Sequence, residues 1–369
     1  MSLKVPYLNL PAQFDCETLW EKLKAQFKSC MFIMGPEVEQ FEKAFAELCG
    51  VKYALGLNSG TDALFLSMKA LGIGPGDEVI TAPNSFIASA GSIVAVGARP
   101  VFCDVGPDYN MDPASLAKAI TPLTKAVMPV HLTGNLADMP AILEITEPRG
   151  IWVLEDAAQA VMAALNGQKA GSFGLAGCFS LHPLKNLNCA GDAGMLTTNN
   201  PDLYEKVRQL KNHGLKNRDE IDFFGYSSRL DTIQAVIGLH GLSRLEETTR
   251  KRRQNAAVYD RELAGLGDDL VIPPRDPARF HVFHTYVVQV NHREELVRFL
   301  ATRGVETKIH YPIPLHLQAP ARAMGYGPGD FPVCEAQAGR ILTLPIHQHL
   351  SGEQLLYACG CIKEFFGAL

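Results

Sequence analysis

Short apolar runs rich in β-branched residues alternate with longer helix-like segments over roughly the first half of the chain. Strands are predicted over residues 53–57, 78–81, 100–104, 126–130, 151–155, 177–181 and 195–198, and helices over residues 60–71, 84–96, 112–119 and 139–146. Near-continuous apolar strands separated by helices are typical of a parallel sheet that is buried on both faces. The pattern predicts an α/β fold whose ligands bind beyond the carboxyl ends of the strands.

A different pattern follows in the last third of the chain. One long helix is predicted over residues 230–263, then a strand over 285–290, a helix over 293–303, a strand before Pro345 and a closing helix over 352–366. The long helix would link the sheet to a smaller α+β unit. The sequence therefore predicts a large domain over residues 1–245, with an N-terminal arm over 1–35, and a small domain over 246–369.

Composition narrows the class of protein. Hydrophobic residues make up 47% of the 369 residues and charged residues 20%, which excludes a disordered chain. With 34 Lys and Arg against 39 Asp and Glu the net charge is −5, so no nucleic-acid surface is predicted. No run of about 18 apolar residues predicts a membrane span. No signal-peptide pattern stands near Met1.

The cysteines indicate the compartment. Nine of them, an odd number, are scattered through the chain, a pattern that fits reduced thiols better than a disulfide framework. We therefore expect a cytoplasmic protein. Cys359 and Cys361 have the wrong spacing for a CxxC pair, and we expect no metal site.

The first motif with chemical potential is Asn58-Ser59-Gly60-Thr61-Asp62, directly after the strand 53–57. A glycine that opens a helix after a tight turn leaves backbone N–H groups free, and the helix dipole favours an anion there. The hydroxyl groups of Ser59 and Thr61 would add donors to a phosphate. An ordinary helix cap is the alternative, because Ser and Thr are common N-cap residues.

The second motif is the acidic end of the strand 151–155, where Glu155 and Asp156 precede Ala157-Ala158-Gln159. A carboxylate at the end of a buried strand needs a partner, because an unpaired buried charge is costly. That partner could be a cationic nitrogen of a cofactor. A solvated turn or a metal ligand would explain the same residues.

The third motif is Phe179-Ser180-Leu181-His182-Pro183-Leu184-Lys185. Apolar surroundings lower the pKa of a lysine and free its amine for attack on a carbonyl carbon. A solvent-exposed lysine is the alternative for Lys185 alone. Gly191-Asp192-Ala193-Gly194 follows as a turn into the next strand.

Taken together and in this order, the motifs match what pyridoxal 5′-phosphate (PLP) requires. The cofactor needs an amine for its aldehyde, an anion for its ring nitrogen, donors for its phosphate and an aromatic surface for its ring. Lys185, Asp156, the Gly60 turn with Ser180, and Phe86 would supply them.

Long segments of the chain match, in order, segments of one known protein family. They are GPEVEQFEKAFAELCGVKYALGLNSGTDAL, GIGPGDEVITAPNSFIASAGSIVAVGARPVFCDV, LEDAAQA, FSLHPLKNLNCAGDAGMLTTN, SSRLDTIQA, IHYPIPLH and LPIHQHLSGEQ. In these segments, from about Val5 to Phe366, the chain resembles the DegT/StrS-type sugar aminotransferases. The resemblance implies a fold type I PLP-dependent transferase, with a mostly parallel seven-stranded sheet and a smaller α+β domain. It also implies a homodimer with its active sites at the interface.

The resemblance implies roles for individual residues. Lys185 would form a Schiff base with PLP and later carry a proton, and Asp156 would pair with the ring nitrogen. The remaining cofactor contacts would be Gln159 at the ring hydroxyl, Phe86 on the ring face, and Gly60, Thr61 and Ser180 at the phosphate. The partner chain usually adds an Asn from a GxNxR-like segment, where this chain has Ser227.

The matching segments also imply a substrate, a nucleotide-linked keto sugar, with L-glutamate as the amino donor and polysaccharide or lipopolysaccharide biosynthesis as the setting. Residues expected to line the substrate pocket are His213, Arg229, His310, Tyr311 and His316. The Gly191–Gly194 turn resembles that of relatives acting on 3-keto sugars, which favours a 3-keto-6-deoxy sugar.

Two alternatives remain within the PLP-binding proteins: a sugar dehydratase, and a PLP-binding regulator without turnover. Relatives that became dehydratases carry histidine in place of the lysine, and Lys185 disfavours that route. The Lys185 and Asp156 pair disfavours the regulator. A nicotinamide dehydrogenase is disfavoured because no G-x-G-x-x-G opens a helix after the first strand.

Overall fold

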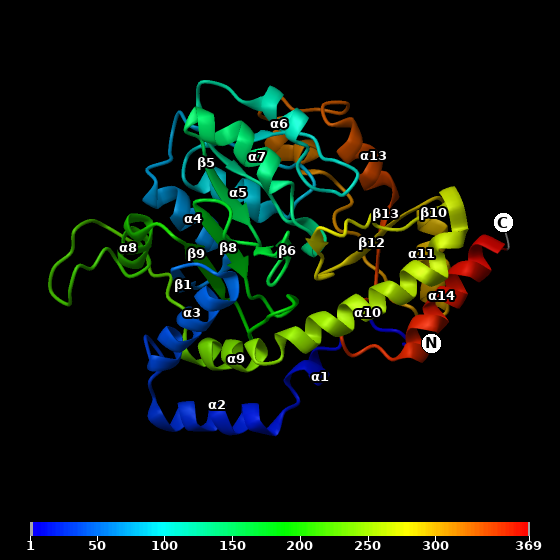
Figure 1. The fold of residues 1–369 in the computed structure, drawn as a ribbon, viewed down its shortest axis with the longest axis horizontal. Helices are drawn as coiled ribbons and strands as arrows, with labels where there is room; N and C mark the ends of the chain where they lie inside the picture. Colours follow the sequence, from blue (N-terminus) through cyan, green and yellow to red (C-terminus); the bar gives the residue numbers. More distant parts are fainter. Residues whose placement is uncertain (1–2, 368–369) are drawn as a thin grey trace.

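The computed structural model describes residues 3–367, and its centre is a seven-stranded sheet with the order β1-β9-β8-β5-β4-β2-β3 (Figure 1). The strands are β1 (Tyr53–Leu57), β2 (Glu78–Thr81), β3 (Arg99–Phe102), β4 (Thr124–Met128), β5 (Trp152–Asp156), β8 (Ala176–Ser180) and β9 (Gly194–Thr198). Only β9 runs against its neighbours. The predicted mostly parallel seven-stranded sheet is confirmed, and each strand lies within two residues of its predicted range.

Helices cover both faces of this sheet: α3 (Pro36–Cys49), α4 (Gly60–Ala70), α5 (Ile87–Ala95), α6 (Pro113–Ala119), α7 (Met139–Thr146), α8 (Pro201–Leu210) and α9 (Thr232–Leu242). Neighbouring strand residues point to opposite faces. Phe179 packs with α3 in one apolar cluster, whereas Cys178 packs with α4 and α8 in another. This alternation explains why the strands read as continuous apolar runs.

The predicted single helix over 230–263 is wrong, because the structure has two helices, α9 and α10 (Leu245–Leu263), with a break at Ser243 and Arg244. The Ser243 hydroxyl donates to the His240 carbonyl (2.7 Å), a local bond that competes with the helix ladder. The two helices also serve different cores. Leu245 packs in the core of the large sheet, and Tyr259 in that of the small domain.

The part of the chain predicted as the small domain has an antiparallel sheet of the order β10-β12-β13 covered by helices, reached along α10 (Figure 1). Its other elements are β10 (Leu270–Val271), β12 (Tyr286–Val290), α11 (Arg293–Thr302), β13 (Ile341–Leu344) and α14 (Gly352–Gly367). Between α11 and β13, helices α12 (Ala319–Arg322) and α13 (Pro332–Arg340) return to the large sheet. There the Cys334 amide donates to Asp104 Oδ1 (2.9 Å).

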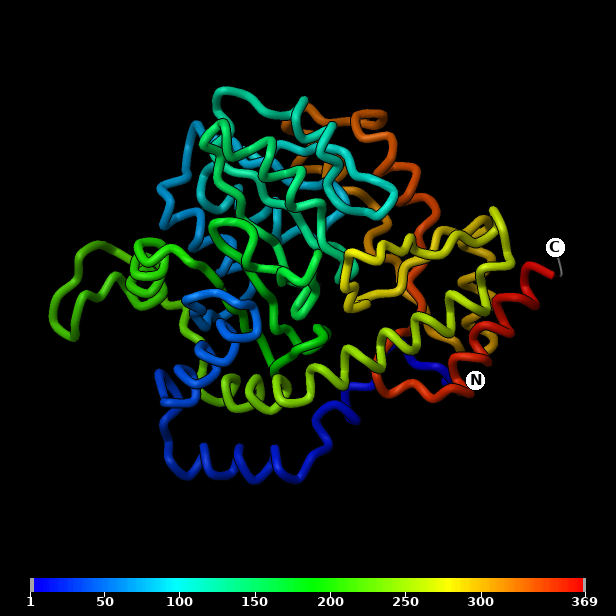
Figure 2. The backbone as a smooth tube through the Cα atoms, viewed as in Figure 1, coloured from blue at the N-terminus to red at the C-terminus, as the bar shows by residue number. Residues whose placement is uncertain are grey.

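The N-terminal segment crosses both parts of the molecule. Val5 is fully buried in the small-domain core and pairs with Val305. The chain then forms α1 (Leu10–Phe14) and α2 (Glu17–Ser29), and α2 packs beside α9 (Figure 2). The two-domain division at residue 245 stays a prediction, because this segment and α13 both connect the two sheets.

A third, small sheet joins β6 (Ala164–Leu165), β7 (Gln168–Lys169) and β11 (Arg279–Phe280). Among the described residues, no helix combines the length and apolar character that a membrane span requires. All nine cysteines are free thiols, and most of them are buried.

Candidate active site

The N-terminus of α4 lies directly against the end of β8. Ser59 caps α4 by accepting a hydrogen bond from the Asp62 amide (3.0 Å). Gly60 has no room for a side chain, because a Cβ atom there would lie 2.8 Å from Cβ of Ser180. Thr61 is exposed beside it. The free N–H groups of the first helical turn and the positive end of the helix dipole make this point suited to a phosphate.

Asp156 ends β5 and is 5% exposed. Its Oδ2 atom accepts a hydrogen bond from Ser89 Oγ of α5 (2.7 Å), and its Oδ1 atom accepts one from the Ala158 amide (3.2 Å). Neither partner carries a charge. The carboxylate is therefore fixed in place and keeps its charge available for a cationic ring nitrogen.

Gln159, just after β5, is also fixed. Its Oε1 atom accepts a hydrogen bond from the Thr133 amide (2.8 Å), and Thr133 Oγ1 lies 3.2 Å from Nε2 of His281. Because the side-chain oxygen is used in this way, the amide nitrogen of Gln159 is the group that can donate to a ligand.

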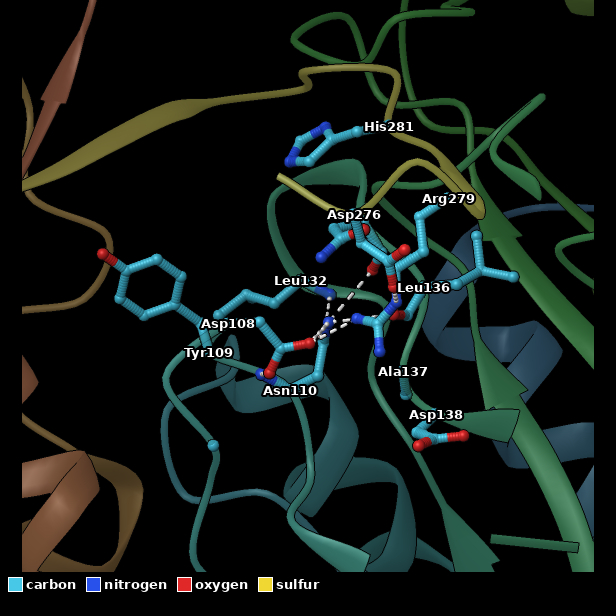
Figure 3. A network of polar contacts seen from close by, with 12 residues as sticks. Asp108, Tyr109, Asn110, Leu132, Leu136, Ala137, Asp138, Asp276, Arg279 and His281 are labelled. Carbon is cyan, nitrogen blue, oxygen red and sulfur yellow. Dashed lines mark hydrogen bonds and ion pairs between the residues drawn. The ribbon is translucent and has the colours of Figure 1, made fainter. Parts of the chain in front are cut away.

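The loop that carries Thr133 is held by the polar network around Arg279 (Figure 3). Arg279 Nη1 donates to Asp108 Oδ2 and to the Leu136 carbonyl (2.9 Å), and Nε lies 3.2 Å from Asp276 Oδ2. Asn110 Oδ1 accepts from the Leu132 amide (3.1 Å). These contacts fix the loop after β4, and through it the side chain of Gln159.

Lys185 lies in the loop between β8 and β9, in a turn where its amide donates to the His182 carbonyl (2.9 Å). Burial lowers the pKa of Lys185 to about 8, although the nearby Asp156 carboxylate opposes that shift. About a tenth of the amine is therefore in the neutral, nucleophilic form at pH 7 and about half at pH 8. Burial and the charge of Lys185 also lower the pKa of His310, to about 4, so this ring is neutral.

Phe86 and Tyr311 border the same space. Phe86 lies at the N-cap of α5, is 55% exposed, and has its ring centroid 5.9 Å from that of Tyr311. Burial, with a contribution from Asp156, raises the pKa of Tyr311 to about 12, so its hydroxyl stays protonated. Next to it, Nδ1 of His310 lies 3.0 Å from Thr343 Oγ1.

The expectation that His316 contacts a substrate is wrong for this chain. The side chain is fully buried, its Nε2 lies 3.0 Å from Glu335 Oε1, and its ring packs edge-on against Phe331. A histidine enclosed in this way supports α13. It has no surface to offer a ligand.

His213, Ser227 and Arg229 belong to the loop over residues 211–229, which projects beyond α8 (Figure 1). Arg229 donates to Asn212 Oδ1 (3.0 Å) and to Ser227 Oγ (3.2 Å), and so closes the base of the loop. Within the described residues, no hydrogen bond or ion pair joins these three side chains to Lys185 or Asp156.

Sequence reasoning missed Ser89 and Thr133. Ser89 follows Phe86 by three positions, one helical turn, so the two could share a face toward the strand end. That spacing was an available signal. Thr133 donates to Gln159 through its backbone amide. Every residue except proline can make such a contact, so the residue type at position 133 does not indicate it.

These residues fit PLP. A Cβ atom at Gly60 would fill the cradle against Ser180. Asp156 faces no cation within ion-pair distance in the part of the chain described, Lys185 has a lowered pKa, and the exposed Phe86 offers an aromatic face. Each chemical group of the cofactor has a matching partner here.

Comparisons with known proteins agree with this geometry. A model of the DegT/DnrJ/EryC1/StrS aminotransferase family matches residues 15–363. A UDP-N-acetyl-3-dehydro-alpha-D-glucosamine 3-aminotransferase of Acidithiobacillus ferrooxidans is 44% identical, covering 90% of this chain and 89% of its own. A "pleiotropic regulatory protein" of Geobacillus stearothermophilus is 41% identical and covers 99% of both chains.

Among solved structures, that of S. venezuelae DesV in complex with a ketimine intermediate superposes with a TM-score of 0.96. The two sequences are 38% identical, and the match covers 99% of each chain. The fold type I architecture expected from the sequence is thereby confirmed.

Proposed function

Because this chain belongs to the DegT/DnrJ/EryC1/StrS aminotransferase family, we propose that it moves an amino group from an amino acid to a keto group of a nucleotide-linked sugar. It is an aminotransferase, and its cofactor is PLP. The observation that carries the proposal is the partly buried amine of Lys185, with its lowered pKa, beside the fixed carboxylate of Asp156.

When bound, PLP supplies an electron sink that makes the hydrogen on the carbon next to an amine acidic. Asp156 would keep the ring nitrogen protonated by pairing with it. Phe86 would cover one ring face, the amide nitrogen of Gln159 would donate to the ring hydroxyl, and the α4 N-terminus with Gly60, Thr61 and Ser180 would hold the phosphate. Lys185, in its neutral form, would attach the cofactor.

Lys185 also carries the proton. Its neutral Nζ would accept the proton that leaves the α-carbon of the amino acid, and its ammonium form would donate that proton at C4′ of the cofactor. A base held beside both atoms makes the transfer effectively intramolecular. The neutral ring of His310 and the protonated hydroxyl of Tyr311 border this space, so both can hydrogen-bond to the sugar without adding charge.

The proposal also covers the amino donor, the sugar acceptor and the homodimer. We assign L-glutamate as the donor and a 3-keto-6-deoxy sugar as the acceptor, for polysaccharide or lipopolysaccharide biosynthesis. His213, Arg229 and Ser227 act across a homodimer, in the partner's site, because they belong to a projecting loop. The free thiols of the nine cysteines favour the reducing cytoplasm.

A regulatory role without turnover is the second candidate, because one relative bears a regulatory name. A pure regulator has no need of a lysine whose pKa is lowered beside a fixed carboxylate. Lys185 also disfavours a sugar dehydratase, because relatives that became dehydratases carry histidine in place of this lysine. Lys185 and Asp156 therefore favour turnover.

The test is a screen of the purified holoenzyme with L-glutamate and UDP-, dTDP- and GDP-linked 3-keto and 4-keto sugars. Mass spectrometry should show one amino sugar nucleotide, with 2-oxoglutarate formed in equal amount. Absence of 2-oxoglutarate with every acceptor, from protein that binds PLP, would refute the proposed transamination.

A further inference from the structure

Arg252, on α10, is a buried cation without an anionic partner among the described residues. Its side chain is 3% exposed. Nε donates to Gln348 Oε1 (3.2 Å), and Nη1 donates to the carbonyl oxygens of Phe283 (3.1 Å) and His284 (3.2 Å). These neutral acceptors satisfy N–H groups but leave the positive charge uncompensated. Arg279, in contrast, is paired with Asp108 and Asp276.

The charge is retained at neutral pH. Burial lowers the pKa of Arg252 only to about 10. Two neighbouring histidines, His284 and His347, have their pKa values lowered by burial and by the Arg252 charge, so they stay neutral and supply no anion. An uncompensated buried cation in an enzyme favours an anionic ligand.

Arg252 borders the same cavity as Lys185, and none of the residues of the phosphate cradle at α4 lines it. The other walls of this cavity are residues of the N-terminal segment, Gln13 included, then Asn188, and residues 347–349 of the small domain. Nη2 of Arg252 has no hydrogen-bond partner in the part of the chain that the structure describes. The guanidinium group thus keeps the N–H groups of Nη2 for a ligand and is held in orientation by Gln348 and two carbonyl groups.

We propose that Arg252 binds the carboxylate of the amino-acid donor, an inference that rests on the proposed transamination. In an amino acid the carboxylate is attached to the very carbon that loses its proton, so it must lie close to Lys185. The diphosphate of a nucleotide sugar is several bonds from the keto carbon and has no such constraint. The free Nη2 group of Arg252 can donate a charge-assisted hydrogen bond to a carboxylate oxygen.

Residues of the N-terminal segment close one side of this cavity. The cavity measures about 10 Å³, room for about one water molecule. Gln13 and Gln348 are hydrogen-bonded to each other across it, and Nε2 of His349 lies 3.3 Å from Gln13 Oε1. Entry of a carboxylate therefore requires that this cluster break and that α1, which carries Gln13, move.

The experiment compares the Arg252→Gln and Arg252→Lys holoenzymes with wild type. The matched control is Arg250→Gln on the same helix, because Arg250 is exposed and pairs only on the surface. Glutarate, which has both carboxylates of glutamate and no amine, is titrated by calorimetry. L-Glutamate is then followed through the half-reaction that releases 2-oxoglutarate.

We expect Arg252→Gln to raise the Kd for glutarate and the KM for glutamate about 10- to 100-fold, the effect of losing hydrogen bonds to a charged group. Arg252→Lys should fall between this variant and wild type, and Arg250→Gln should match wild type. Binding of UDP or dTDP, whichever wild type binds, should not change.

Unchanged glutarate and glutamate constants in Arg252→Gln would overturn the inference while the proposed function stands. If Arg252→Gln lost both glutarate and nucleotide binding and also had a lowered Tm, Arg252 would have only a structural role. That result would also overturn the inference. If Arg252→Gln does not fold, the Kd for glutarate and the KM for glutamate of Arg252→Lys are compared with those of wild type instead. Unchanged values in Arg252→Lys would then overturn the inference. A wild-type enzyme that releases no 2-oxoglutarate at all would instead remove the proposed function.

Discussion

Ser89 Oγ donates a hydrogen bond of 2.7 Å to Oδ2 of Asp156, and both side chains are buried. Ser89 is itself held, because its Oγ lies 3.0 Å from that of Ser85. The helix after β2 therefore fixes the carboxylate at the end of β5. This hydrogen bond joins the segment around Phe86 to the segment around Asp156. Neither segment by itself indicates it in the sequence.

Ser89→Ala should lower the affinity for PLP. The variant loses one hydrogen bond to a charged acceptor, worth about 1.5–3 kcal/mol, so we expect a Kd about 10-fold higher or more in a PLP titration. Ser92→Ala is the matched control, since its buried hydroxyl donates only to the Ser89 carbonyl. Equal affinities of the two variants would contradict the role given to Ser89.

Attachment of PLP to the cofactor-free protein should follow the pKa of Lys185. The neutral fraction of an amine rises with pH through its pKa. Because the pKa of Lys185 is lowered from 10.5 to about 8, the attachment rate should rise up to about pH 8 and then level off. Exposed lysines continue to gain reactivity toward a pKa of about 10.4.

Borohydride reduction followed by peptide mapping identifies the lysine concerned, and Lys185→Ala should yield folded protein without the adduct. A rate that keeps rising to pH 10, or an adduct on another lysine, would count against this assignment.

Gly60→Ala should weaken PLP binding through the phosphate. The new Cβ atom would lie 2.8 Å from Cβ of Ser180, so the first turn of α4 must move. We expect about a tenfold loss of PLP affinity, about 1.4 kcal/mol. Gly360→Ala in α14 is the control: its Cβ meets nothing within 4 Å, and alanine stabilises a helix interior by about 0.5–1 kcal/mol. A wild-type affinity in Gly60→Ala would show that the phosphate lies elsewhere.

The pattern of apolar residues was sufficient for the sheet, because strands buried on both faces leave little doubt about where each begins and ends. It failed at Ser243 and Arg244, where apolar periodicity continues although the chain passes from one core to another. Which core a residue joins is a tertiary property that a local pattern does not contain.

The candidate site divides in the same way. Asp156 and Gly60 stand at a strand end and a helix start, and Lys185 lies in the loop after β8; the order of elements locates all three. Ser89 and Arg252 act through contacts between segments far apart in the chain. His316 lies in a segment that resembles the family's, yet its neighbour Glu335 encloses it. Such contacts depend on packing and could not be predicted from motifs.

Ser227 offers a test of the homodimer. It stands where the family resemblance implies an asparagine, and its hydroxyl accepts a hydrogen bond from Arg229 (3.2 Å) at the base of the projecting loop. If this loop reaches the partner's phosphate site, Ser227→Ala should raise the Kd for PLP about 2- to 10-fold, the loss of one hydrogen bond of about 0.5–1.5 kcal/mol. Ser227→Asn should lower the Kd, because an asparagine side chain reaches further than a hydroxyl.

Both variants are measured together with the oligomeric state, by PLP titration and sedimentation of the same samples. Asp219→Ala, further along the loop, serves as the control because Asp219 is exposed. A dimeric protein in which all three variants bind PLP as wild type does would make Ser227 a bystander. A monomeric wild type with full PLP affinity would remove the shared site itself.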